Sequence, residues 1–337
     1  HWKEHSKNSL NPLLETIQAG LEAGDIEYTG YAIILYCDKL FLVGESLDLV
    51  NQQQEKYINW LKKNKQDFSL FYAKIVGQVV LNLSKITDDK YRFIGKFFDE
   101  REMLPILQKT NNITSLFIFY STKAQLNYLL KNFTEAVATA TMAEKYEQAS
   151  TGLIMSSAYN FYYSLALLAH HLSSGKSEST ACLEKVSTNQ QKLKIWADHA
   201  PMNFLHKYHL VEAEKARVLG DYLTAMEYYD RAIKGAREQG YVQEEAIAYE
   251  RAAEFYLSIG RQEISQLYLK NAHHCYSRWG ATIKVKDLES EFPQLFIGTT
   301  HQTGIEAIIT TSSTTGNSSQ VLDLTAVIKA SQILAGE

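Results

Sequence analysis

The chain has 337 residues, a mass of 38.3 kDa and a net charge of −4, with 45% hydrophobic and 21% charged residues. This composition excludes global disorder, and the lack of a basic excess argues against a nucleic-acid partner. Gly and Pro contribute only 17 and 4 residues, about half their usual share, which disfavours an all-β or collagen-like fold.

Cysteine content and hydropathy narrow the class of protein further. Cys37, Cys182 and Cys275 are too few and too scattered for a disulfide framework or a Cys-rich zinc site, so we expect reduced, buried thiols. No apolar run reaches the roughly 18 residues that a membrane helix needs. The chain starts at His1 without a signal peptide, so we expect an excised piece of a longer cytoplasmic protein with no membrane partner.

Helical spacing begins near the N-terminus. Asn11-Pro12 suits the first turn of a helix. The apolar runs 71–83 and 115–120 indicate buried helices, with a strand as the alternative for 115–120. Residues 124–146 are similar in pattern to two helix pairs that follow later in the chain.

Those later pairs give the clearest periodicity. Residues 204–219 and 222–239 form one predicted pair, and 246–260 and 261–280 form the next. A shift of 40 residues superposes one on the other and aligns Gly220 with Gly260. With weaker breaks included, the pattern is interrupted at about 40–45-residue intervals, which is typical of a helical solenoid. These breaks fall near 44, 88, 131, 175, 220 and 260.

Small residues recur at matching positions of the repeats. They let antiparallel helices approach closely, while an aromatic ring fills the space between neighbouring pairs, so that copies must stack to bury both faces. We therefore predict an all-α, right-handed superhelix of about six tetratricopeptide-like helix pairs over 1–296. Its packing positions are Ala124, Ala136, Ala143, Ala213, Ala225, Tyr229, Ala232, Ala253 and Ala272.

The C-terminal end differs in composition. Residues 297–320 are rich in Ser, Thr and Gly, so we predict a flexible linker. Residues 321–337 resume helical spacing and predict an amphipathic helix. Its apolar stripe would pack on the solenoid, on a second copy as a homodimer contact, or on another domain.

The helix pairs resemble tetratricopeptide repeats, most clearly in GDYLTAMEYYDRAI at 220–233. The period is longer than 34 residues, and His209 and Glu212 replace the Trp and Leu of the first helix. In such repeats the first helix of each pair lines a concave wall that binds extended peptides or neighbouring domains. By this resemblance the candidate interaction surface comprises Lys207, Glu214, Arg217, Glu250 and Glu254. The alternative is that these residues form the solvated face of the array.

A second resemblance covers nearly the whole chain. Residues 11–47, 203–233, 275–295 and 322–337 are similar to the helical region of very large cyanobacterial-type hybrid kinases. The resemblance implies a Ser/Thr kinase and an ATPase module before this region, and a GAF domain and a histidine kinase after it. Helix 321–337 would then lead toward the GAF domain. No kinase or nucleotide-binding motif lies in this sequence, so we expect no catalytic residue here.

Histidine-based sites are the remaining chemical candidates. His206, His209 and Glu212 share one helical face and offer two imidazoles and a carboxylate to zinc, but no fourth ligand follows at a fixed spacing. A structural role is therefore the favoured interpretation. The adjacent pairs His170-His171 and His273-His274 point about 100° apart and suit packing or surface roles. We predict no metal and no cofactor.

The resulting functional prediction is a non-catalytic scaffold that couples the ATPase and kinase half of a sensor kinase to its GAF and histidine-kinase half. Its partners would be other domains of that parent or a protein or peptide. The alternative is a sensor that binds a small effector inside the superhelix. A metalloenzyme built on His206 and His209 is the third hypothesis.

Overall fold

A computed structural model of the chain describes residues 2–87, 89–174 and 179–296. The chain divides into two units, His1–Phe296 and Ile297–Glu337. The predicted linker 297–320 and helix 321–337 therefore lie outside the described residues. The described part is all-α, as predicted, and contains no strand beyond an isolated bridge between Ile94 and Asp99.

The helices of the first half follow a short 3₁₀ turn, η1. Residues 115–120 lie inside one of them, so the strand alternative for this run is wrong. In chain order the elements are η1 (Ser6–Ser9), α1 (Leu10–Ala23), α2 (Ile26–Leu42), α3 (Leu47–Lys63), α4 (Asp67–Ser84), α5 (Glu100–Lys109), α6 (Ile113–Leu129) and α7 (Phe133–Glu144).

The second half continues in the same manner. A further 3₁₀ turn, η2, precedes it, and the predicted pairs 204–219 with 222–239 and 246–260 with 261–280 correspond to α10 to α13. The elements are η2 (Glu147–Ser150), α8 (Met155–Ser174), α9 (Ser179–His199), α10 (Pro201–Leu219), α11 (Tyr222–Glu238), α12 (Val242–Ser258), α13 (Gln262–Trp279), α14 (Thr282–Glu291) and α15 (Pro293–Phe296).

The turns between helices recur with a fixed spacing. Residues with positive φ occur twenty or twenty-one positions apart within three runs of the chain. A left-handed residue after the last helical turn ends the helix and redirects the chain. Glycine adopts this conformation without a steric penalty, but lysine and asparagine take it at three of the turns. The runs are Gly24, Gly44 and Lys65; Asn111, Lys131 and Gly152; and Gly220, Gly240, Gly260 and Gly280.

Polar side chains start several of the helices. Asp221 accepts a hydrogen bond from the Thr224 N–H at the start of α11, and Asp25 and Asn112 cap α2 and α6 in the same way. Pro201 occupies the first turn of α10. A left-handed residue followed by a capping residue thus separates these helices with a connection of two or three residues.

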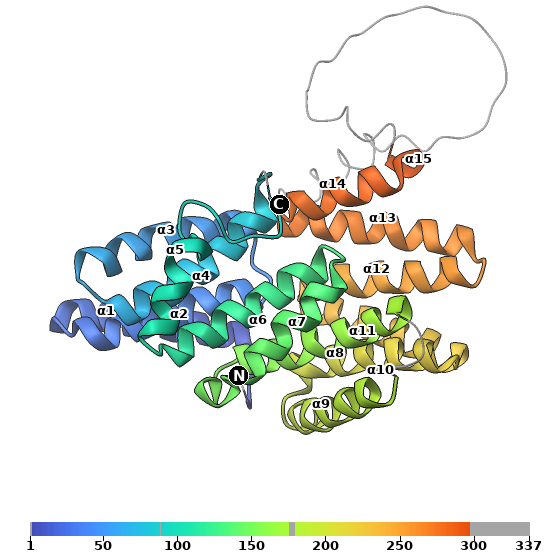
Figure 1. Ribbon diagram of the computed structural model, residues 1–337, viewed down its shortest axis with the longest axis horizontal. Coiled ribbons are helices and arrows are strands. Elements are labelled where there is room, and N and C mark those ends of the chain that lie inside the picture. The colour runs from blue at the N-terminus through green and yellow to red at the C-terminus, as the bar shows by residue number, and fades with distance from the viewer. Residues whose placement is uncertain (1, 88, 175–178, 297–337) are drawn as a thin grey trace, which may run out of the picture. The chain divides into compact units, whose positions relative to one another are not determined.

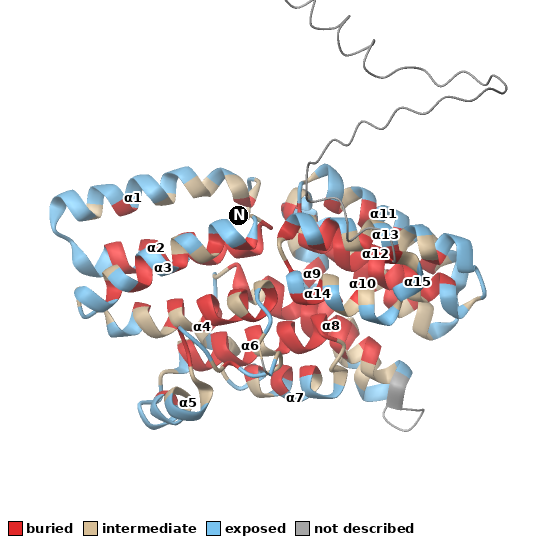
Figure 2. Cartoon of the chain, turned by 90° about the horizontal axis from the view of Figure 1, so that it is seen from above, coloured by how far each residue is buried: buried red, intermediate tan, exposed pale blue. Residues whose placement is uncertain are grey.

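The even-numbered helices form an inner layer. Contacts run from α2 to α4, α6, α8, α10 and α12 in succession, while α1, α3, α7, α11 and α13 each pack on an inner helix (Figure 1). The inner helices are buried around most of their circumference, whereas α1 is largely exposed (Figure 2). The nine predicted packing residues, Ala124 to Ala272, are all buried.

The inner layer also closes between its two ends. Helix α14 contacts α4, and the ring of Phe41 on α2 stacks on Trp279 at the end of α13 with centroids 6.0 Å apart. Gln243 Nε2 donates a hydrogen bond to the Leu42 carbonyl at 2.8 Å. Residues about 200 positions apart therefore share one core. No described helix is long and apolar enough to cross a membrane.

The close approach of α10 and α11 yields a stability prediction. A Cβ added at Gly235 would lie 3.1 Å from the Cβ of His206. Gly235→Leu should lower the free energy of unfolding by about 1–3 kcal/mol because the larger side chain forces the two helices apart. The neighbouring Lys234 is exposed, so Lys234→Leu is the matched control and should change it by less than about 0.5 kcal/mol. Equal effects of the two substitutions in urea denaturation would contradict this packing.

Candidate functional site

The five residues of the predicted interaction surface lie on the inner helices α10 and α12. Lys207, Glu214 and Glu250 are buried, and Arg217 and Glu254 are partly buried. Each has a charged partner in the same chain. Binding of a partner to this surface stays a prediction, but in the isolated chain its charges are already paired.

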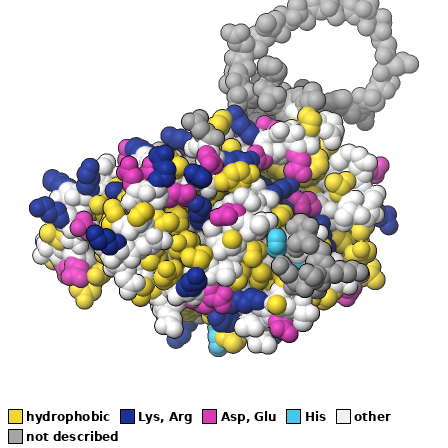
Figure 3. Space-filling model, viewed as in Figure 1, with side chains coloured by type: hydrophobic (Ala, Val, Ile, Leu, Met, Phe, Trp, Pro, Cys, Tyr) yellow, Lys and Arg dark blue, Asp and Glu magenta, His cyan; other side chains and the backbone are white. Residues whose placement is uncertain are grey.

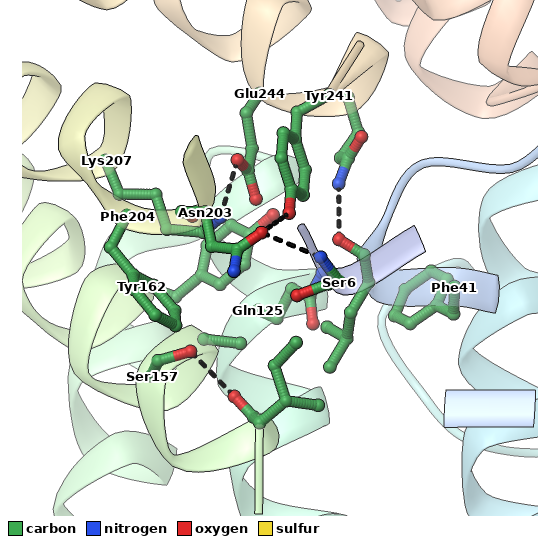
Figure 4. Close-up of a pocket in the computed structure, with 14 residues that line it drawn as sticks. Ser6, Phe41, Gln125, Ser157, Tyr162, Asn203, Phe204, Lys207, Tyr241 and Glu244 are labelled. Atoms are coloured by element: carbon green, nitrogen blue, oxygen red, sulfur yellow. Dashed lines mark hydrogen bonds and ion pairs between the residues drawn. The ribbon is translucent and has the colours of Figure 1, made fainter. Parts of the chain in front are cut away.

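One polar cluster joins α10 to α12. We call Asn203, His206, Lys207, Tyr241 and Glu244 the Lys207 cluster. Lys207 Nζ donates to Glu244 Oε2 at 2.8 Å, and His206 Nε2 is hydrogen-bonded to the same oxygen. Tyr241 donates to Asn203 Oδ1 at 2.7 Å, and its ring lies 4.4 Å below the Lys207 ammonium (Figure 4).

Burial governs the protonation of this cluster. Burial, and then the neighbouring Lys207, lower the pKa of His206, which favours the neutral imidazole. Burial alone would raise the pKa of Glu244, but Lys207 and His206 keep it below its usual range. The stable arrangement is therefore an ion pair between Lys207 and Glu244 with a neutral histidine bound to the same carboxylate.

A cavity of about 10 Å³ lies beside this cluster. Ser6, Gln125 and Tyr162 face it together with members of the cluster (Figure 4). A volume of this size holds about one water molecule. It is far below the roughly 300–1,000 Å³ typical of a small-molecule site.

A second polar cluster lies where the middle of the inner layer meets its C-terminal end. We call Lys131, Glu250, Glu254, Tyr276 and Lys284 the Glu250 cluster. Glu250 accepts from Lys284 at 2.8 Å and from Tyr276 at 2.6 Å, and Lys131 Nζ lies 3.4 Å from it. Lys131 also pairs with Glu254 at 3.0 Å. This cluster joins the α6–α7 turn to α12, α13 and α14.

The charges of the Glu250 cluster stabilise one another. Burial alone would raise the pKa of Glu250, but Lys284 and then Lys131 lower it to about 2. Burial lowers the pKa of Lys284, and Glu250 opposes that effect. Paired charges of this kind add little net stability over an apolar replacement, but removing one partner leaves a buried, unpaired ion. They therefore fix how the α6–α7 turn meets α12 and α14.

A further buried carboxylate, that of Asp38, is bound by a tyrosine hydroxyl. Asp38 on α2 is 1% exposed, and its Oδ2 accepts a hydrogen bond from Tyr72 at 2.9 Å. Its Oδ1 has no hydrogen-bond partner among the described residues. Burial raises the pKa of Asp38 to about 7. The adjacent Cys37 is a free, buried thiol whose pKa burial also raises, which suits a packing role rather than reactivity.

The histidine candidates do not form a metal site. His206 binds Glu244, whereas Glu212 accepts a hydrogen bond from Gln190 at 2.7 Å. His209 is half-buried beside Tyr228, and burial lowers its pKa to about 4. Within residues 2–87, 89–174 and 179–296, no three potential ligands come close enough together to hold a metal ion. His273 instead bonds Glu289 at 2.9 Å.

Several members of the two clusters were not predicted from the sequence. Lys131 follows α6 in a turn whose positive φ of 60° is carried by a lysine, so no glycine marks it. Lys284 lies on the short helix α14, and Asn203 lies in the first turns of α10. For Lys284 the local signal is a lysine between the apolar residues Ile283 and Val285, and it identifies no partner.

Comparison with known proteins gives a limited relationship. No family model matches the chain. A segment of 60 residues, 18% of this chain, is 40% identical to hybrid signal transduction histidine kinase G of Dictyostelium discoideum. The match spans about 2% of the length of that relative. It relates the chain to signal-transduction kinases and agrees in this respect with the resemblance noted in the sequence.

The Glu250 cluster predicts a specific pattern of stability. Glu250→Gln should lower the free energy of unfolding by about 3–5 kcal/mol because it leaves buried Lys284 without its carboxylate. Adding Lys284→Met should recover part of this loss. The exposed pair Glu227–Arg231 is the control, and Glu227→Gln should cost less than about 1 kcal/mol. Urea denaturation measures all three, and equal losses at Glu250 and Glu227 would contradict the proposed role of burial.

Asp38 predicts a pH-dependent stability. Its pKa of about 7 in the folded chain exceeds the value of about 3.9 in an unfolded one, so the folded chain binds the proton more tightly. The stabilisation of the folded chain by protonated Asp38 is complete below pH ~4 and is lost as the pH rises to ~7. Asp38→Asn cannot ionise and should therefore avoid this loss. The variant should have a free energy of unfolding higher than the wild type by on the order of 4 kcal/mol at and above pH ~7.

Thermal and urea unfolding between pH 4 and 8 would measure this difference. Asp198 is exposed and pairs with Lys194 at 3.1 Å, so Asp198→Asn is the matched control. It should change the stability by less than about 1 kcal/mol across the range. A stability difference between Asp38→Asn and the wild type that stays constant with pH would refute the assignment.

Proposed function

We propose that this chain is a tetratricopeptide-like helical array that acts as a non-catalytic coupling module of a cytoplasmic signal-transduction kinase. The observation that carries the proposal is the regular spacing of its left-handed turns, twenty or twenty-one residues apart, combined with the inner layer of even-numbered helices. Such spacing is that expected of stacked helix pairs, each contacting its neighbours. The partial match to a hybrid histidine kinase supports the signalling context.

The filled interior favours a scaffold over a small-ligand sensor. The cavity beside the Lys207 cluster, about 10 Å³, is too small for an effector molecule, and the charged side chains of the Lys207 and Glu250 clusters have partners within the chain. Contacts with other domains are therefore expected on the outer surface.

The outer surface offers an apolar groove for such contacts. It lies between α1 and α3 and has a volume of about 500 Å³. Leu14 and Leu21 are exposed there. The other apolar residues that line it are Ile17, Ile33, Tyr57 and Trp60, and its polar residues are Glu15, Gln18 and Lys56. Apolar side chains gather at the surface over the N-terminal helices (Figure 3). An exposed groove of this kind suits the apolar face of a helix from another domain of the parent kinase.

A binding experiment tests the proposal. The chain should bind the separately purified ATPase and kinase half, or the GAF and histidine-kinase half, of its parent, measured by calorimetry. Leu14→Asp combined with Leu21→Asp should weaken this binding at least tenfold because the groove becomes charged. Ala19 and Ala23 are exposed on the same helix outside the groove, so the same double change to Asp at these positions is the matched control.

The outcomes separate the hypotheses. Failure of the chain to bind either half would contradict the coupling role. Equal weakening by the two double variants would reject the groove but keep the coupling role. Incorporation of phosphate from ATP by the purified chain alone would contradict its non-catalytic assignment.

A further inference from the structure

The side-chain amide of Asn203 is one anchor of the N-terminal segment, residues 2–9. Asn203 Nδ2 on α10 donates a hydrogen bond to the Glu4 carbonyl at 2.8 Å. The same amide accepts one from the Ser6 N–H, at 2.9 Å, through its Oδ1. Asn203 thus binds the main chain at two residues, the Glu4 carbonyl as an acceptor and the Ser6 N–H as a donor. A side-chain amide can do this because it has both an NH₂ donor and an oxygen acceptor.

An aromatic side chain provides the second anchor of the segment. The ring of Trp2 stacks on Phe204 of α10 with centroids 5.4 Å apart, and it lies 5.7 Å from Trp196 of α9. His5 Nε2 lies 3.0 Å from the Gln239 carbonyl. Stacked aromatic pairs contribute beyond the area that they bury, so the ring selects for an aromatic residue at this position.

Residues outside the segment orient the receiving amide. Asn203 Oδ1 also accepts the hydrogen bond from Tyr241. Tyr241 packs under Lys207, and Lys207 pairs with Glu244. The amide is therefore oriented by α10 and α12 themselves (Figure 4).

We propose that α9, α10 and α12 form a peptide-binding site and that residues 2–9 are its tethered ligand. The site recognises a peptide with an aromatic side chain followed, four residues later, by a residue whose N–H is free to bond Asn203. This proposal is independent of the coupling role. A tether supplies an effective concentration in the millimolar range, so a free peptide binds well only when the tethered copy is weakened.

Two substitutions weaken the tethered copy without changing the receiving residues. Trp2→Ala removes the stacked ring. Ser6→Pro removes the N–H whose hydrogen bond Asn203 accepts. The backbone tolerates proline at this position because His5 has φ −57° and ψ 131°, as residues before proline prefer. Ser6 also begins a helical turn, where proline is accommodated. The full chain with both substitutions should retain its helical circular dichroism.

The test measures binding of a fluorescein-labelled peptide with the sequence of residues 2–9, WKEHSKNS, by anisotropy. The double variant should bind it at least tenfold more tightly than the wild-type chain, in which the tethered copy competes. Ser6→Pro or Trp2→Ala in the peptide should each weaken binding at least tenfold. Lys3 and Asn8 are exposed, so Lys3→Ala and Asn8→Ala peptides are the matched controls and should bind as the parent peptide does.

Substitutions in the peptide cannot unfold the protein, so their effects report recognition alone. Asn203→Ala in the double variant should also abolish binding, with circular dichroism as the check on its fold. The proposal is overturned if the double variant does not bind the peptide. It also falls if the Ser6→Pro and Lys3→Ala peptides bind equally well. Neither result bears on binding to the kinase halves, so the coupling role is judged separately.

Discussion

Pairing of buried charges at Glu250 is the constraint on which the arrangement of the inner helices depends. Lys284 on α14 and Lys131 in the α6–α7 turn approach this carboxylate from two widely separated parts of the chain. A buried ion tolerates no displacement that leaves it unpaired. The α6–α7 turn and α14 must therefore meet α12 in one register, which joins the middle of the layer to its C-terminal end. Apolar packing alone, as at Phe41 and Trp279, would accept several registers at similar cost.

The local features of this fold could be predicted from sequence because their causes are local. Ala213 and Ala253 are buried at equivalent positions since a helix returns to the same face every three or four residues. Gly220 and Gly260 mark turns since the left-handed conformation favours glycine. The turn at Lys131 has the same geometry without the glycine, and the sequence therefore indicated it more weakly.

The environment of the inner face could not be predicted in the same way. Helical periodicity placed Lys207 and Glu250 on one wall, but the residues that cover this wall lie far away in the sequence. Glu250 meets Lys131, more than 100 positions earlier, and Asn203 meets Ser6, almost 200 positions earlier. A single sequence contains no periodic signal that links such partners. The interior was therefore expected to be an open groove, whereas the described structure fills it with side chains of the same chain.

A filled interior changes how this array can respond to another protein. A partner must bind the outer surface or displace something already inside. Displacing Lys284 would leave the buried charge of Glu250 without one of its ion-pair partners, which is destabilising. Displacing residues 2–9 instead returns peptide groups to water, where they regain hydrogen bonds, and leaves the Lys207–Glu244 ion pair in place. Of these two elements, the segment that Asn203 holds is the one whose exchange costs less, so a partner can replace it without unfolding the array.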